Sequence, residues 1–276
     1  MERFKNTQIR TQVQKGMYIN MDPNQYLSAG WNVYNNLPTT TQELLLNPSA
    51  KTIGSALDSA VTVFCAPLLL LGAVSKPLIK KFANEIEHKI NAIPEENRDV
   101  SQTGLLIKAL EDARYQLNKD AIRKLYVNII ASTLDNRKNE SIGPRYGTVI
   151  AQFSKKDAVF LEKLYKNEPL PYVRTRLKLD DNGVGYTLPQ RLAVADNDEI
   201  INNFDASLDV LNSLGIAFDH RTSSITTYTQ RYELGEKIQK QIFSDKITNA
   251  PKGSEAERSY ITLTTFGKNL CYYIFE

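Results

Sequence analysis

Apolar residues recur at steps of three and four between Ile122 and Leu134, and this period predicts a long amphipathic helix. The positions that share its apolar face are Ile122, Leu125, Tyr126, Ile129, Ile130, Thr133 and Leu134. Asn118 precedes the run and is expected to cap the helix, with Asp120 near the positive end of the helix dipole. We expect the rest of the chain to be organised around this helix.

A corner made of Pro94, Glu95, Glu96 and Asn97 lies ahead of the central helices. Proline disfavours a helical conformation at the residue before it and suits the first turn of a new segment. The two glutamates would then meet the positive end of a helix dipole. The pattern favours a helix-start corner, and a recognition surface for a partner is the alternative.

An uncharged segment covers residues 60–74, with the sequence AVTVFCAPLLLLGAV. A membrane-spanning helix needs about 20 apolar residues, whereas this segment is shorter and is interrupted by Pro67 and Gly72. A buried core helix is therefore the favoured interpretation. Reversible insertion into a membrane and an oligomer interface are the open alternatives. A membrane contact would be made by Phe64, Leu68, Leu69, Leu70 and Leu71.

The next part of the chain predicts a helix followed by a strand. Ser154 and Asp157 have the spacing of a capping box, and the helix that they begin should end before Pro169. Apolar and basic residues then alternate up to the turn sequence Asp181-Asn182-Gly183, which is typical of a strand entering a turn. We expect the basic side chains to form one solvent-facing edge, with contact to nucleic acid as the alternative reading of Arg174, Arg176 and Lys178.

The C-terminal residues predict further helices and short strands. Residues 198–215 have the period of an amphipathic helix, which Gly215 would close at a C-cap position. A short strand at 216–218, a helix at 232–243, a strand at 260–263 and a closing helix to Phe275 are expected after it. This pattern resembles the last helix and wing of a winged-helix domain. Its two candidate strands lie about 40 residues apart, which is farther than a simple wing requires.

The predicted fold is mainly α, and α+β overall. A helical bundle would be followed by a winged-helix-like C-terminal domain with a few short strands. The expected boundaries are a polar N-terminal extension at 1–50, a helical domain at 51–153 and the winged-helix-like domain at 154–276. The extension is rich in Asn, Gln and Thr and is interpreted as a flexible arm. The whole chain, with 42% hydrophobic and 24% charged residues, has the composition of a globular protein.

The charge is nearly balanced in both parts of the chain. Residues up to Ile150 include 18 basic and 14 acidic side chains, and the rest include 16 and 17, so the net charges are +4 and −1. Neither part has the strongly basic character of a nucleic-acid-binding domain, which argues against nucleic acid as the partner. Two cysteines and an N-terminus without an apolar signal segment predict a cytoplasmic protein, with peripheral membrane association upon activation.

Candidate chemistry is sparse. Glu111 and Asp112 lie beside Arg114, and paired carboxylates near a base can perform acid–base chemistry. No histidine, serine or cysteine arrangement completes such a site, so a solvated helix face with weak ion pairs is expected. The sequence also lacks metal-ligand spacing and a Gly-Lys-Ser or Gly-Lys-Thr phosphate loop. We therefore expect no enzymatic activity, no cofactor and no metal.

Several stretches resemble the Abi-alpha family, a bacterial domain named for abortive infection, in which an infected cell halts or dies before phage can spread. They are Ile93–Asn97, Ala109–Tyr115, Ala131–Asp135, and Phe153 to Ala158, in the family's order. The resemblance implies phage defence, and candidate interaction residues at Pro94, Glu95, Glu96, Asn97, Arg114 and Tyr115. Where the family commonly has a His-Pro-Ser-Phe-like junction, this chain has Gly143-Pro144-Arg145-Tyr146, so no role of that histidine can be transferred.

Three hypotheses follow. The leading one is a phage-defence protein that acts without catalysis, through contacts with an unidentified phage or host protein or with a membrane. The alternative is a winged-helix transcriptional regulator. The third is a purely structural or inhibitory partner protein. Self-association into a homo-oligomer is compatible with all three.

Overall fold

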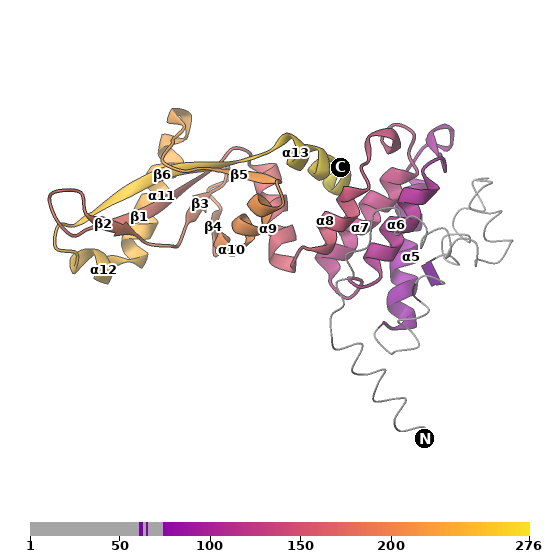
Figure 1. The fold of residues 1–276 in the computed structure, drawn as a ribbon, viewed down its shortest axis with the longest axis horizontal. Coiled ribbons are helices and arrows are strands. Elements are labelled where there is room, and N and C mark those ends of the chain that lie inside the picture. The colour runs from indigo at the N-terminus through magenta and orange to yellow at the C-terminus, as the bar shows by residue number, and fades with distance from the viewer. Residues whose placement is uncertain (1–60, 63–64, 66–73) are drawn as a thin grey trace, which may run out of the picture.

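The computed structural model describes residues 61–62, 65 and 74–276, and this part of the chain has an α+β fold (Figure 1). Within it, nine α-helices accompany a six-stranded antiparallel sheet. The molecule is elongated, with a helical end, a sheet end, and α9, α10 and α13 between them. The α+β prediction is confirmed. The predicted extension at 1–50 lies outside the described residues.

Four helices form the helical end. They are α5 (Lys76–Asn91), α6 (Thr103–Ala113), α7 (Asp120–Thr133) and α8 (Arg145–Ala151), with the short 3-10 helices η1 (Glu95–Asn97) and η2 (Asn139–Ser141). Helix α7 is central, because α5, α6, α8, α9 and α13 all pack against it. Every residue of its predicted apolar face is buried, and Val127 and Ala131 are buried as well. Burial on nearly all sides is what a central helix requires.

The start of α7 differs from the prediction that Asn118 caps it. Lys119 occupies the N-cap position and makes no side-chain capping bond. The buried Arg123 guanidinium holds this turn instead, since it pairs with Asp120 at 2.6 Å and donates to the Leu117 carbonyl oxygen at 2.8 Å. Arg123 therefore fastens the turn ahead of α7 to the helix, but as a donor it does not replace the acceptor that an asparagine cap would offer to the first backbone N–H groups.

Helix α9 (Lys155–Lys166) begins with the predicted capping box. The Ser154 backbone N–H donates to Asp157 Oδ2 at 2.7 Å, and the Asp157 N–H donates to Ser154 Oγ at 3.3 Å. Two backbone donors that the helix itself cannot satisfy are thus bonded.

Substituting Ser154→Ala is expected to lower the free energy of unfolding by about 1 kcal/mol, because one capping acceptor is lost. Urea denaturation followed by circular dichroism measures this change. Ser154→Thr keeps the hydroxyl and serves as the control, so a loss of similar size in both variants would contradict the capping role.

The sheet has strand order β4-β3-β1-β6-β5, with β2 also paired to β1. Its strands are β1 (Leu170–Lys178), β2 (Gly185–Thr187), β3 (Leu192–Val194), β4 (Ile200–Asn202), β5 (Ala217–His220) and β6 (Ser254–Leu263). Every pairing is antiparallel. The long strands β1 and β6 form the centre, in a register that pairs Leu170 with Ile261 and Leu177 with Ser254.

The two faces of the sheet have separate cores. Leu170 and Tyr172 alternate with Val173 along β1, so they lie on opposite faces. The first face packs on α9, α10 (Asp205–Ser213) and α13 (Thr265–Phe275), within the same core as the helical end. The second face packs on α11 (Thr229–Ile242) through Tyr232.

Helix α13 joins the sheet to the helical end. The Asn128 side chain of α7 donates from Nδ2 to the Ile274 carbonyl oxygen at 2.6 Å. One apolar core consequently runs from Val61 to Ile274, across the predicted boundary at residues 153 and 154. That boundary stays a prediction.

The segment between β5 and β6 explains the wide spacing of the two strands. It contains η3 (Thr226–Tyr228), α11 and α12 (Ser244–Thr248), and α11 crosses the second face of the sheet before the chain returns as β6. The predicted helix at 232–243 and the closing helix are confirmed. The winged-helix assignment stays a prediction.

Candidate functional site

The Pro94–Asn97 corner is fastened to the chain that leaves α7. The Asn136 N–H donates to the Asn97 carbonyl oxygen at 2.9 Å, and the Asp99 N–H donates to the Leu134 carbonyl oxygen at 3.0 Å. An isolated β-bridge joins Arg98 to Asp135 between these bonds. The corner is therefore fixed by backbone bonds to a segment almost 40 residues away.

Side chains add to this clasp. Asn97 Nδ2 donates to Asn136 Oδ1 at 3.0 Å, and Asn139 Nδ2 donates to Asp99 Oδ2 at 2.7 Å. Hydrogen bonds from Ser101, followed by the one from Asn139, hold the Asp99 pKa below its usual value. Glu95 and Glu96 stay exposed on the outside of the corner. The geometry accounts for Asn97 as a structural residue, whereas a partner-recognition role for the two glutamates stays a prediction.

Arg114 and Tyr115 lie at the other end of α6. Arg114 is the C-cap residue, and its guanidinium carbon lies 4.6 Å from the centre of the Tyr115 ring, which is 62% exposed. Helix α6, which lies between this pair and the corner along the chain, has 11 residues and is about 16 Å long. The six family-motif residues form two places on the molecule rather than one site.

Two residues of the apolar segment 60–74 lie in helix and in the core. Val61 is fully buried and Cys65 is 2% exposed. Burial raises the pKa of the Cys65 thiol to about 11, against a smaller opposing effect of Arg114. Phe64, Leu68, Leu69, Leu70 and Leu71, the candidate membrane contacts, lie outside the described residues. Across 61–62, 65 and 74–276, no helix has the length and apolar character needed to cross a membrane.

The pair Glu111 and Asp112 is less solvated than predicted. Burial raises the pKa of both carboxyl groups, although Lys108 and Arg114 oppose the change. Lys108 Nζ lies 2.9 Å from Asp112 Oδ2. Helix α8 covers Asp112 closely, since a Cβ atom added at Gly147 would lie 2.8 Å from that same oxygen.

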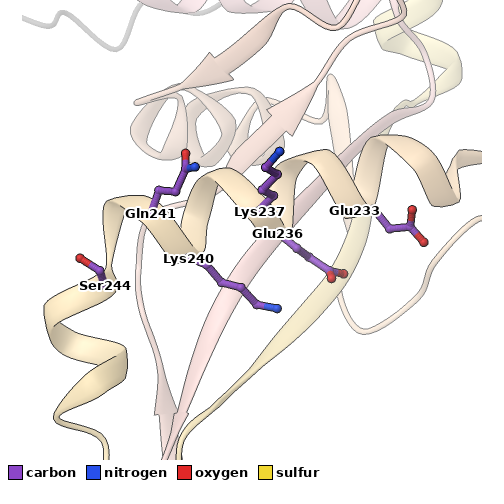
Figure 2. A pocket seen from close by; sticks show the side chains of 6 residues that line it. All are labelled: Glu233, Glu236, Lys237, Lys240, Gln241 and Ser244. Carbon is purple, nitrogen blue, oxygen red and sulfur yellow. The ribbon is translucent and has the colours of Figure 1, made fainter.

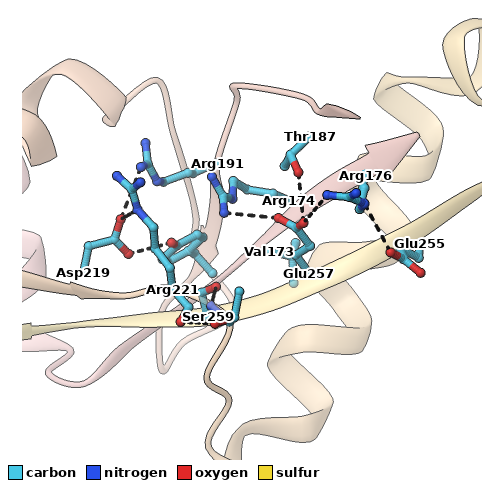
Figure 3. A network of polar contacts seen from close by, with 12 residues as sticks. Val173, Arg174, Arg176, Thr187, Arg191, Asp219, Arg221, Glu255, Glu257 and Ser259 are labelled. Carbon is cyan, nitrogen blue, oxygen red and sulfur yellow. Dashed lines mark hydrogen bonds and ion pairs between the residues drawn. The ribbon is translucent and has the colours of Figure 1, made fainter. Parts of the chain in front are cut away.

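The three basic residues of β1 do not form a solvent-facing edge. Strand β1 is interior to the sheet, and β6 places glutamates beside its basic side chains (Figure 3). The ion pairs are Arg174–Glu257 at 3.1 Å, Arg176–Glu255 at 3.5 Å and Lys178–Glu255 at 2.7 Å. The prediction of an open basic edge was wrong, because alternation along one strand cannot reveal which strand pairs with it.

Asp219 is the centre of a buried polar network beside this ladder of charges (Figure 3). Its carboxylate accepts hydrogen bonds from Tyr172 Oη at 2.6 Å, from Arg221 Nε at 3.0 Å and from Arg191 Nη2 at 3.2 Å. Arg191 also donates to Asp205 at 2.7 Å. Sequence reasoning missed this network because its members come from separate strands and loops, with no local spacing to reveal them.

A surface groove follows the outer side of α11 (Figure 2). Its volume is about 560 Å³, and it is lined by Glu233, Glu236, Lys237, Lys240, Gln241 and Ser244. The lining has two acidic and two basic side chains, and Glu236 is paired with Arg258 at 2.6 Å. Balanced charge gives this groove no evident preference for a charged ligand.

A larger and more basic groove lies between α5 and α7. Its volume is about 810 Å³, and it is lined by Pro77, Lys80, Lys81, Asn84, Glu85, His88, Lys89, Lys124, Val127 and Asn128. The sequence analysis missed it because nothing along the chain shows which helix packs beside the polar residues of α5. Their alignment with Lys124, from another helix, arises in the folded chain.

Metal ligands do not cluster in the part of the chain that the structure describes: it contains no group of three or more His, Cys, Asp or Glu residues placed to hold an ion. The polar side chains described above instead form ion pairs, fasten the Pro94–Asn97 corner, or line the two surface grooves.

These features define an α+β protein in which a helical bundle shares its core with an antiparallel sheet. The family model described as "Abortive infection alpha" matches residues 76–274, so the chain belongs to that family. The match includes both the helical end and the sheet, and it confirms the resemblance found in the sequence.

Other comparisons add little. No curated protein matches the chain significantly. A solved structure of an uncharacterized protein from the hydrocarbon-degrading marine bacterium Alcanivorax borkumensis SK2 is similar, with 16% sequence identity and a TM-score of 0.32. The similarity covers 48% of this chain and 92% of that one.

Proposed function

We propose that this protein acts in abortive infection through contacts with a phage or host protein, or with a membrane, rather than through catalysis. The observation that carries the phage-defence part is the family match, which spans residues 76–274. The non-catalytic part is supported by the polar networks. The Asp219 carboxylate and the basic residues of β1 are engaged in internal pairs that hold strands together.

The proposed trigger is a rearrangement of the uncharged segment 60–74. Val61 and Cys65 contribute to the core that Ile86 and Ile130 also form. If Val61 and Cys65 leave that core upon infection, apolar surface becomes available to a membrane or a partner, since exposed apolar surface drives such contacts. The resting protein would keep this surface covered, and infection would uncover it.

A phage challenge at low and high multiplicity tests the proposal. Cells that carry the gene are expected to form fewer plaques at low multiplicity, and their culture is expected to arrest or collapse at high multiplicity. Cells without the gene are the control. Survival of the protected culture at high multiplicity would contradict abortive infection, and an absence of protection across a broad phage panel would contradict the defence role.

The membrane version has its own test. Fractionation of infected cells is expected to move the protein into the membrane fraction, and a variant with Leu69→Asp and Leu70→Asp is expected to lose defence. A folded variant with full defence, together with wild-type protein that stays in the soluble fraction during infection, would leave a protein partner as the mode of contact.

The exposed glutamates of the corner provide a test of partner recognition. The double substitution Glu95→Gln and Glu96→Gln is expected to reduce plaque protection at least about tenfold, if each carboxylate contributes a charged contact to the partner. Its thermal midpoint should not change, because both side chains are exposed. The double variant Glu87→Gln and Glu233→Gln, which removes two exposed glutamates elsewhere, is the matched control. Equal protection by both double variants would exclude the corner from recognition.

DNA binding by a winged-helix regulator is not part of this proposal. Arg174 and Lys178 have carboxylate partners within 3.1 Å, so contact with phosphates would require those pairs to separate. The hypothesis predicts salt-sensitive binding that weakens when Arg174, Arg176 and Lys178 are changed to Gln.

A further inference from the structure

We propose that the groove between α5 and α7 binds a phosphate-bearing small molecule of nucleotide size. The inference concerns a ligand of the helical end and is independent of how the protein contacts its partner. It depends on the charge of the groove, on the geometry of its two walls and on its volume.

The charge of the groove is strongly positive. Lys80, Lys89 and Lys124 line it and have no ion pair within the described residues. Lys81 lines it as well and lies 4.0 Å from Glu85 and 3.7 Å from Asp120. Four ammonium groups therefore face a common space, where their mutual repulsion is relieved by a bound anion.

Glu85, the one carboxylate of the lining, does not cancel this charge. Its two oxygens accept hydrogen bonds from the buried Arg123 guanidinium, at 2.9 Å from Nε and 3.2 Å from Nη2. The arginine side chain is only 1% exposed, so Glu85 is held as the counter-ion of a buried charge. The positive charge of the lysines is therefore available to a ligand.

The walls of the groove are regular. On α5, Lys80, Asn84 and His88 form one row at steps of four residues, and Lys81, Glu85 and Lys89 form the adjacent row. The opposite wall is Lys124, Val127 and Asn128 on α7, also within one turn. The ion pair between Glu85 and Arg123 fastens the two helices at the base of the groove. This wall geometry is built into rigid helices rather than loops.

The groove offers apolar as well as charged contacts. Pro77 and the nearly buried Val127 contribute carbon surface, and the lysine side chains add their methylene stems. Asn84 and His88 add side chains that can form hydrogen bonds beside the ammonium groups. A ring with attached phosphates fits both kinds of contact, because the ring can pack on the apolar surface and the phosphates can pair with the lysine ammonium groups.

The size of the groove favours a small molecule over a polymer. Its volume of about 810 Å³ is within the range of small-molecule sites, roughly 300–1,000 Å³. Lys80 and Lys89 lie nine residues apart on α5, which corresponds to about 14 Å. A nucleic-acid strand would instead need a basic track that continues along the molecule.

Isothermal titration calorimetry of the full chain with ATP, inorganic triphosphate and adenosine tests the proposal. ATP is expected to bind, triphosphate more weakly because it lacks the ring, and adenosine without measurable heat because it lacks the charge. The double substitution Lys80→Gln and Lys124→Gln should weaken ATP binding about tenfold or more. The double substitution Lys155→Gln and Lys156→Gln, on the exposed start of α9, is the matched control and should leave the affinity unchanged.

Three results would overturn the proposal. The first is absence of binding by ATP and triphosphate at low salt. The second is an equal loss of affinity in both double variants, which would indicate non-specific attraction to surface lysines. The third is tighter binding of a single-stranded oligonucleotide or of vesicles containing phosphatidylglycerol, lost in the same groove variant, which would assign the groove to a polymer or a membrane. Thermal midpoints of both variants should equal that of the wild type, because the substituted lysines, Lys80, Lys124, Lys155 and Lys156, are all exposed.

Discussion

Substituting Asp219→Ala is expected to lower the free energy of unfolding by about 3–5 kcal/mol, the usual cost of breaking a buried ion pair from one side. The Asp219 side chain is 4% exposed and that of Arg191 is 8% exposed. Without Asp219, the Arg191 guanidinium keeps its bond to Asp205 but loses its buried counter-ion. The Tyr172 hydroxyl also loses its acceptor, and a buried polar group without a partner is costly.

Urea denaturation of the purified variant measures this loss. The control is Asp181→Ala, which removes a carboxylate that is 79% exposed and paired with Lys252. Because exposed ion pairs contribute little, that variant is expected to stay within about 0.5 kcal/mol of the wild type. If the two variants lose equal stability, the network around Asp219 does not hold the sheet as we infer.

Substituting Gly267→Ala is expected to lower the free energy of unfolding by about 3 kcal/mol, because the new methyl group has no space. An added Cβ atom would lie 2.1 Å from the Ile216 carbonyl oxygen, which is backbone and cannot rotate away. That oxygen also accepts hydrogen bonds from the backbone and the hydroxyl of Thr264, at 2.9 and 3.2 Å. Helix α13 can approach the β5 segment so closely only with glycine at this position.

The matched control is the same chemical change at Gly104, in the first turn of α6. An added Cβ atom there meets nothing within 4 Å. Alanine is the better helix former, so Gly104→Ala is expected to raise the free energy of unfolding by about 0.5–1 kcal/mol. The two substitutions should therefore have opposite signs in one denaturation series. A Gly267→Ala variant as stable as the wild type would disprove the close packing of α13.

The two tests examine the join between the helical end and the sheet. Gly267 lies where α13 passes the sheet, and Asp219 belongs to the edge strand β5. Since α13 shares one core with α7, a substitution that destabilises either place should also destabilise the helical end. Circular dichroism at 222 nm and near-ultraviolet dichroism should then follow one common transition, as expected for a cooperative unit.

Local signals in the sequence were enough to predict most of the helices. The three- and four-residue period of α7, the capping box of Ser154 and Asp157, and the closing helix after Thr264 all involve residues within one or two turns of each other. Such interactions are readable from spacing alone. The family also could be recognised in this way, because its motifs lie in order along the chain.

Contacts between distant segments could not be read in the same way. The basic residues of β1 suggested an open edge until β6, some 80 residues later, supplied Glu255 and Glu257. The α5–α7 groove joins Lys80 to Lys124, and the clasp of the corner joins Asn97 to Asn136. Neither pair has a periodic relation along the chain.

The sequence by itself determined most of the helices, the α+β class and the family, because helix caps, period and motif order are properties of neighbouring residues. It did not determine β4 (Ile200–Asn202), which lies at the start of the stretch 198–215 that was predicted to be one helix, whereas α10 begins only at Asp205. Only the tertiary structure decided which charges are free and which are neutralised. Arg174 and Lys124 are both basic residues in polar stretches, yet β6 neutralises the first and the packing of α5 on α7 leaves the second facing a groove. Strand order and helix packing depend on long-range pairing, which no local pattern encodes.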